Sequence, residues 1–123
     1  MLEENLTEQI IGAAIDVHRY WGPGLYEEIY EKSLCRELDL REIKFQNQLS
    51  IPLIYKDFKV GDDLKVDVFV ANKVVVELKA VSNLLPVHTA QLITYMKLLK
   101  AKIGLLINFN VPTLKNGLKR IVL

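Results

Sequence analysis

One stretch decides the fold of this chain: Leu64-Lys65-Val66-Asp67-Val68-Phe69-Val70-Ala71-Asn72-Lys73-Val74-Val75-Val76-Glu77-Leu78-Lys79-Ala80. Two runs rich in β-branched residues flank a short polar segment, a pattern that predicts a β-hairpin. Because side chains alternate between the faces of a strand, one face is expected to be wholly apolar, with Val66, Val68, Val70, Val74, Val76 and Leu78. The other face is predicted to carry Lys65, Asp67, Phe69, Val75, Glu77 and Lys79.

The register of this hairpin has a chemical consequence. A three-residue turn at Ala71–Lys73 places Asp67 opposite Glu77, whereas a two-residue turn would mix the apolar and polar faces. Like charges directly opposed on a sheet are unfavourable. A divalent cation held between the two carboxylates would offset this repulsion, and paired carboxylates are usual ligands of Mg²⁺. The alternative is a ladder of Asp–Lys ion pairs on an exposed sheet face, and local geometry leaves both interpretations open.

The rest of the chain supplies the other elements of the fold. Hydrophobic periodicity predicts helices over 7–20, 25–38 and 88–100, with Thr7 as the first N-cap and a break at Trp21–Gly24. Extended segments are expected over 43–55, 102–108 and 119–123, and 56–63 is expected to be a polar turn. The order α-α-β-β-β-α-β predicts one α/β domain over 1–123, with a mixed sheet flanked by helices.

Composition limits the class of protein. The 123 residues are 50% hydrophobic, which suits a domain with a real core, and no stretch approaches the length of a membrane span. Cys35 is the only cysteine, so no intrachain disulfide can form, and with two histidines a zinc site is not expected. These features, and an acidic N-terminus without a signal-peptide pattern, favour the cytoplasm.

Charge is distributed unevenly along the chain. Residues 1–77 hold all 15 acidic and nine basic residues, a net charge of −6, whereas 78–123 hold seven basic and no acidic residues, a net charge of +7. This asymmetry favours a polyanion such as DNA or RNA as partner of the basic half. The alternative is that these side chains balance acidic faces of the N-terminal helices. The candidate nucleic-acid-binding residues are Lys97, Lys100, Lys102, Lys115, Lys119 and Arg120.

Several motifs together resemble a known family. Gly24-Leu25-Tyr26-Glu27-Glu28-Ile29-Tyr30 has the form GxxExxY, and it is followed by Asp67, by Glu77-Leu78-Lys79, by Gln91-Leu92-Ile93-Thr94-Tyr95 and by Gly104-Leu105-Leu106-Ile107-Asn108-Phe109. Over nearly its whole length the chain is similar to the GxxExxY proteins, which are assigned to the PD-(D/E)XK nuclease superfamily. The resemblance implies a restriction-endonuclease-like αβββαβ core, here with an extra N-terminal helix.

The resemblance also implies a site. Asp67, Glu77 and the backbone carbonyl of Leu78 would bind Mg²⁺ or Mn²⁺, with Glu27 as a further ligand, and Lys79 would position water or stabilise charge on the phosphate. Gln91 and Tyr95 match a QxxxY element that supports the site in RecB-like exonucleases.

Two further residues are supporting candidates. His88 lies one helical turn before Gln91 and is in reach of a phosphate, although a histidine at a helix start more often has a structural role. Tyr30 is expected to pack with a tethered hydroxyl.

The implied function is metal-dependent hydrolysis of phosphodiester bonds in DNA or RNA. The alternative is a non-catalytic nucleic-acid-binding or protein-interaction module on a nuclease fold. Val66 precedes Asp67 where the family name has proline, and the chain has no evident recognition domain. Substrate choice is therefore expected to come from the basic surface, a homodimer or another protein partner.

Overall fold

A computed structural model describes the backbone of residues 2–123 and the side chains from Glu4 onward. Residues 2–123 form three α-helices, seven strands and one short 3₁₀ helix. In order these are α1 (Leu2–Trp21), α2 (Glu27–Leu40), β1 (Phe45–Ile51), β2 (Ile54–Tyr55), β3 (Phe58–Lys59), β4 (Leu64–Val70), β5 (Val74–Lys79), α3 (Pro86–Leu99), β6 (Ile103–Asn108), η1 (Leu114–Gly117) and β7 (Leu118–Val122).

Five of the strands form one mixed sheet in the order β1-β4-β5-β6-β7. The pair β5–β6 is parallel and its crossover contains α3, while the other neighbours are antiparallel. In the central hairpin Val70 pairs with Val74 and Val68 with Val76, so the predicted three-residue turn and register are confirmed. The predicted mixed sheet flanked by helices is confirmed as well.

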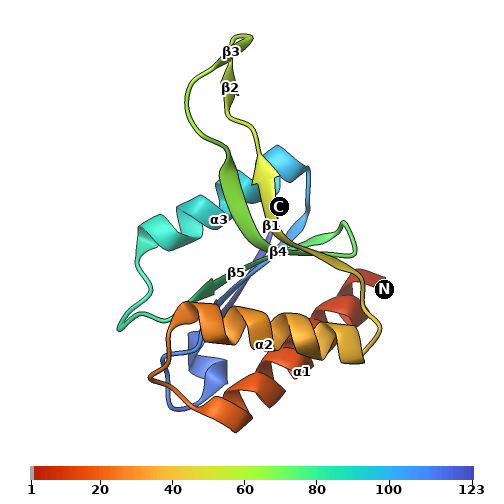
Figure 1. Cartoon of the computed structure of the whole chain (residues 1–123), viewed down its shortest axis with the longest axis vertical. Coiled ribbons are helices and arrows are strands. Elements are labelled where there is room, and N and C mark those ends of the chain that lie inside the picture. Colours follow the sequence, from red (N-terminus) through yellow and green to blue (C-terminus); the bar gives the residue numbers. More distant parts are fainter. Residues whose placement is uncertain (1) are drawn as a thin grey trace.

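Helices cover both faces of this sheet (Figure 1). One buried apolar cluster joins α1 and α2 to the side chains of Val68, Val70, Val74, Val76 and Leu78. The second cluster joins α3 to Phe69, Val75 and Val66. The alternative of an exposed face with a ladder of ion pairs is therefore wrong, because α3 packs on that face and buries Phe69 and Val75. Val66 also departs from simple alternation, since it packs in the cluster on the α3 side.

The first helix is longer than its hydrophobic pattern predicts. It begins at Leu2, so Thr7 is not its N-cap but a buried residue inside it. The helix ends at Trp21, one residue beyond the predicted end at Tyr20, and the turn that follows contains Gly22 and Gly24 at φ values of +68° and +103°. Glycine adopts such angles without steric cost, which fixes the start of α2 at Glu27. None of the helices within residues 2–123 combines the length and hydropathy that crossing a bilayer requires.

Residues 52–63 form a hairpin arm that projects from the body (Figure 1). Sequence predicted an extended segment followed by a polar turn, but β2 and β3 pair with each other as a separate two-stranded sheet. The turn residues Lys56 and Asp57 have φ values of +48° and +67°, as tight hairpin turns require. The arm exposes the apolar side chains of Ile54, Tyr55, Phe58 and Val60.

Candidate metal centre

The pairing between strands β4 and β5 ends next to the two acidic residues Asp67 and Glu77. Their pairing ends at Val68–Val76, and beyond it the Leu78 N–H donates to Oδ2 of Asp67 at 2.9 Å. Asp67 is 9% exposed and Glu77 is 4% exposed. The two carboxyl groups are thus buried at the point where the hairpin opens, which removes the basis for a solvent-exposed ladder of ion pairs.

Among the acidic residues whose side chains the structure describes, Glu77 has the pKa furthest from its ordinary value. Burial, followed by the neighbouring Asp67 carboxyl, raises the pKa of Glu77 to about 10, and Lys79 only partly opposes this rise. Its Oε1 is buried and lacks a hydrogen-bond partner. A buried oxygen without a partner is costly unless a ligand satisfies it. The donor set therefore fits a hard cation, for which carboxylate oxygens are the usual ligands.

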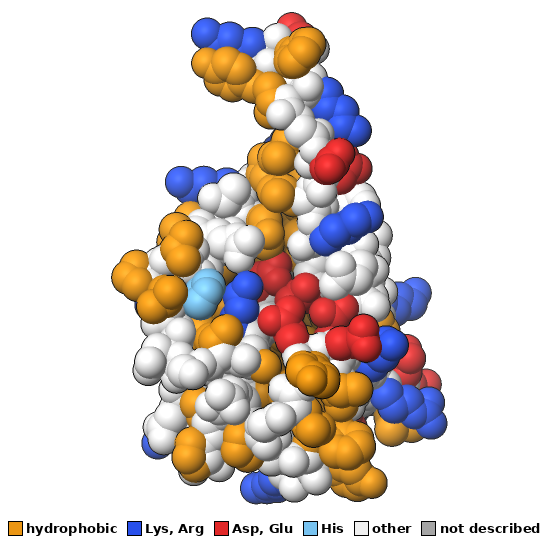
Figure 2. Space-filling view, turned by 60° about the vertical axis from the view of Figure 1, so that its left-hand side comes forward, with side chains coloured by type: hydrophobic (Ala, Val, Ile, Leu, Met, Phe, Trp, Pro, Cys, Tyr) orange, Lys and Arg blue, Asp and Glu red, His pale blue; other side chains and the backbone are white. Residues whose placement is uncertain are grey.

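Helix α2 brings two more carboxylates to this point. Glu27 and Glu31 are four residues apart and therefore lie on one face of the helix. Each offers an oxygen that, with one from Asp67, forms a group of three oxygens within 4.8 Å of one another. Burial is the main cause that raises the pKa of both residues, and the Asp67 charge adds to it. Figure 2 shows acidic side chains gathered on one face of the body, below the projecting arm.

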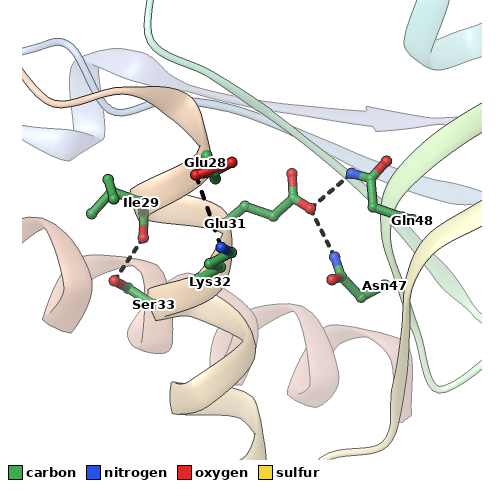
Figure 3. Close-up of polar contacts among 7 residues, drawn as sticks. All are labelled: Glu28, Ile29, Glu31, Lys32, Ser33, Asn47 and Gln48. Carbon is green, nitrogen blue, oxygen red and sulfur yellow. Dashed lines mark hydrogen bonds and ion pairs between the residues drawn. The ribbon is translucent and has the colours of Figure 1, made fainter.

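Two amides from β1 reach the same cluster. Asn47 Nδ2 and Gln48 Nε2 donate to Oε2 of Glu31 at 2.9 and 2.7 Å (Figure 3). The same nitrogens donate to the backbone oxygen of Asp67 at 2.8 Å and to its Oδ1 at 3.2 Å. Gln48 has a φ of +53°, an uncommon backbone angle for a residue other than glycine. This local twist of β1 lets adjacent residues direct both amides toward α2 and β4.

The opposite side of the centre is built by β5 and α3. Lys79 Nζ lies 3.4 Å from Oε1 of Gln91, on the second turn of α3. Tyr95, one turn further on, is 5% exposed. Burial raises the pKa of Tyr95, and the neighbouring carboxyl groups of Glu77 and Asp67 add to the rise. The QxxxY element is therefore beside the carboxylates.

A comparison with known families agrees with this arrangement. The model of the PD-(D/E)XK nuclease superfamily matches residues 4–121. The chain belongs to the PD-(D/E)XK nuclease superfamily. The match supports nuclease chemistry at the level of the superfamily and does not single out the GxxExxY proteins within it. Searches of curated proteins and of solved structures found no match.

Two of the predicted supporting residues make structural bonds in this member of the superfamily. The Tyr30 hydroxyl donates to the Gly22 carbonyl at 2.6 Å and accepts the Leu25 N–H at 3.1 Å, so it ties down the turn before Glu27. The Tyr30 ring stacks on Phe109. His88 Nδ1 accepts the Leu85 N–H at 3.0 Å and caps the start of α3.

The basic candidates do not form one surface around the superfamily motifs. Lys100, Lys102 and Arg120 line a cavity of about 540 Å³ together with Lys73. This basic cavity lies where β5 and β6 begin, whereas Glu77 and Lys79 end β5, a separation of about 17 Å along the strand. The other candidates lie elsewhere: Lys97 in the last turn of α3, Lys115 in η1 and Lys119 in β7.

Sequence analysis missed three residues of the centre. Glu31 was signalled by its spacing of four from Glu27, but such spacing is common on solvated helix faces. Asn47 and Gln48 carry no signal, because an ordinary strand would place neighbouring side chains on opposite faces. Only the local backbone angle of Gln48 brings both amides to Glu31.

Proposed function

We propose that this chain is a nuclease that hydrolyses phosphodiester bonds of DNA or RNA with Mg²⁺ or Mn²⁺. The observation that carries the proposal is the carboxyl group of Glu77. It is 4% exposed, its Oε1 has no hydrogen-bond partner, and it stands beside Asp67 where the hairpin opens. Membership of the PD-(D/E)XK superfamily supports the same chemistry.

In this proposal the cation is held by Asp67, Glu77 and the Leu78 carbonyl, with Glu27 as a further ligand. A bound divalent cation neutralises charge on the phosphate and makes water a better nucleophile near neutral pH. The Leu78 N–H donates to Oδ2 of Asp67 and so orients that carboxyl group. Glu77 must lose its proton to act as a ligand, so cation binding is expected to be coupled to proton release.

The remaining residues act on the phosphate and the water. Lys79 positions the attacking water or stabilises the charge that develops on the phosphate, and Gln91 holds its ammonium from α3. Tyr95 packs beside these groups and limits access of solvent. His88 and Tyr30 support the centre indirectly, through the start of α3 and through the turn before Glu27.

The proposal is tested by cleavage of labelled single- and double-stranded DNA and RNA with Mg²⁺ or Mn²⁺. We expect cleavage by the parent chain and a loss of about 10²- to 10³-fold in Glu77→Gln and Lys79→Gln. Glu28→Gln is the matched control, because Glu28 lies next to Glu27 but pairs only with the exposed Lys32. A parent chain that cleaves none of these substrates with either ion contradicts the proposal.

The basic cavity favours a second candidate, a non-catalytic nucleic-acid-binding module. Four cationic side chains line that cavity, which suits contact with phosphates. This candidate predicts binding that weakens with salt and survives Glu77→Gln, with no cleavage by the parent chain. The same panel of substrates therefore separates the two functions.

A further inference from the structure

We propose that the exposed aromatic side chains around the α1–α2 turn form a stacking platform for the unpaired bases of a single-stranded substrate. This aromatic platform consists of Tyr20, Trp21 and Tyr26, which are 78%, 44% and 85% exposed. The inference deepens the proposed nuclease function and rests on it, since it assigns single-stranded DNA or RNA as the substrate class of the acidic centre.

The first argument is the position of the aromatic platform beside the acidic centre. Tyr26 is the N-cap residue of α2 and directly precedes Glu27. The Tyr30 hydroxyl bonds to the Gly22 carbonyl and to the Leu25 N–H, which fixes the turn that carries Tyr26. Figure 2 shows hydrophobic side chains directly below the acidic ones on the same face of the body. A strand whose phosphate lies at the centre can therefore pass over these rings.

The second argument is that two of the rings are held in place although they face water. Trp21 Nε1 donates to the Ser33 hydroxyl at 2.9 Å, and that hydroxyl donates to the Ile29 carbonyl at 2.7 Å. The Tyr20 ring meets the indole edge-on, with 4.7 Å between the ring centroids. Side chains that are already ordered lose little conformational freedom when a ligand binds. Ordered, exposed rings suit base stacking, which tolerates any base because every base has a π-face.

The third argument is the charge beside the rings. Tyr20, Trp21 and Arg36 line a cavity of about 410 Å³ between α1 and α2. The other charged residues that line this cavity are in ion pairs: Asp16 and Glu37 with Arg41, and Lys32 with Glu28. Arg36 has no ion-pair partner among the described residues, so its guanidinium is available to a phosphate. An arginine beside aromatic rings suits a nucleotide whose base stacks on a ring.

The fourth argument is the spacing along α2, which indicates a single strand. Ser33, which holds the indole, lies six residues after Glu27, about 9 Å along the helix. Stacked nucleotides of one strand rise about 3.4 Å each. The aromatic platform is therefore within reach of the two or three nucleotides that adjoin a phosphate at the centre. In a duplex the faces of these bases are already stacked on their neighbours, and unstacking them is costly.

Binding of short labelled single strands of DNA and RNA, and of the matching duplexes, tests the inference apart from catalysis. Fluorescence anisotropy without divalent ions measures binding while no cleavage occurs. We expect the parent chain to bind single strands about tenfold or more tightly than duplexes. Binding of single strands should also quench the fluorescence of Trp21, the only tryptophan, because a base stacks on its indole.

Tyr26 offers the cleanest variants, because its side chain makes no capping hydrogen bond and is largely exposed. Tyr26→Leu removes the ring and should weaken single-strand binding about tenfold, whereas Tyr26→Phe keeps the ring and should bind within about twofold of the parent chain. Leu40→Ala is the matched control, because Leu40 is an exposed apolar residue at the other end of α2. Circular dichroism and the thermal midpoint establish that each variant is folded.

The outcomes separate this inference from the nuclease proposal. Equal affinity of the parent chain for single strands and duplexes would overturn the inference, as would unchanged single-strand binding in Tyr26→Leu. Loss of binding in Tyr55→Ala but not in Tyr26→Leu would overturn it and place the base contact on the arm. Self-association that Tyr26→Leu abolishes, with no binding of nucleic acid, would overturn it in favour of a protein contact. A parent chain that binds single strands through Tyr26 but cleaves nothing would refute the nuclease proposal and leave the aromatic platform standing.

Discussion

The two ends of β5 place ionisable side chains in opposite environments. At its C-terminal end Glu77 is buried beside Asp67, with a pKa raised to about 10 by burial and by that neighbour. At its N-terminal end Lys73 lines an open cavity with Lys100, Lys102 and Arg120, and these four side chains are solvent-exposed. The same strand therefore connects a buried carboxyl group to a set of exposed basic side chains.

This difference indicates which ionisable side chains of the chain are evidence for a functional site. The sequence separates an acidic N-terminal part from a basic C-terminal part, and both look equally distinctive as totals. Among the residues whose side chains the structure describes, Asp67 and Glu77 are the acidic residues that are buried, and buried carboxyl groups with perturbed pKa values gather at functional sites. Exposed lysines bear no cost of desolvation, so their clustering is weaker evidence for a site.

The largest expected effect tests this contrast directly. Asp67→Asn should lower the cleavage rate by about 10²- to 10³-fold, because Asp67 contacts the Leu78 N–H, Gln48 and the other acids. Lys102→Gln should leave the rate within about threefold, because its charge is already solvated. Initial rates on one substrate at saturating Mg²⁺ provide the measurement. A similar loss of cleavage rate in both variants would contradict the distinction between the buried acidic residues and the exposed basic residues.

The reactivity of the Cys35 thiol should depend on the neighbouring acidic residues, although Cys35 is not part of the acidic centre. Burial first, and then the charges of Glu31, Asp39 and Asp67, raise the pKa of its thiol to about 11. Since only the thiolate reacts, alkylation of the folded protein at pH 8 should be about a hundredfold slower than that of the unfolded chain. The rate should climb tenfold per pH unit up to about pH 11. A rate that levels off near pH 9 would show that the thiol is unperturbed.

Packing under α3 should affect stability by a smaller amount. A Cβ at Gly104 would lie 2.5 Å from Met96 Sδ and 3.0 Å from Leu92 Cδ1, so Gly104→Ala forces β6 and α3 apart. We expect a loss of about 1–3 kcal/mol in the free energy of unfolding, measured with urea. Gly61→Ala in the arm is the control, because nothing lies within 4 Å of a Cβ there. Equal destabilisation by both changes would contradict the packing argument.

The smallest expected effect concerns the basic cavity. If Lys102 and Arg120 each contact a phosphate, the double variant Lys102→Gln/Arg120→Gln should reduce the slope of log K against log salt by about two for double-stranded DNA. Fluorescence anisotropy without divalent ions measures binding alone. Lys32→Gln on the exposed side of α2 is the control and should leave the slope unchanged. An unaltered slope in the double variant would exclude the cavity from the DNA contact.

The parts of the fold that sequence could predict are those fixed by hydrophobic alternation. The β4–β5 register follows from valines on both sides of a short turn, and a one-residue slip would have exposed them. The hairpin sequence left open whether its second face was exposed, because the packing of α3 on Phe69 and Val75 is a tertiary contact. The start of α1 was placed too late because Thr7 was taken as the N-cap, whereas it lies inside the helix.

The residues of the site could be predicted from the sequence only where they belong to a recognisable motif. Asp67, Glu77 and Lys79 stand out in an apolar hairpin, and Glu27 is found through the GxxExxY motif. Glu31, Asn47 and Gln48 come together through the backbone twist at Gln48 and the approach of α2 to β1, which are tertiary features. The cavity likewise unites Lys73 with Arg120, residues far apart in the sequence.

The arm can accept substitutions and changes of length without disturbing the apolar core. Residues 52–63 all lie in the described part of the chain, and none belongs to either apolar cluster. The arm leaves β1 a few residues after Gln48 and joins β4 a few residues before Asp67, so both its roots are next to the acidic centre. Sequences that descend from this one can therefore change the length or the side chains of the arm, or replace it. Each such change would alter the surface that lies beside the acidic centre. Specificity can evolve there as an exchangeable part while the chemistry stays fixed.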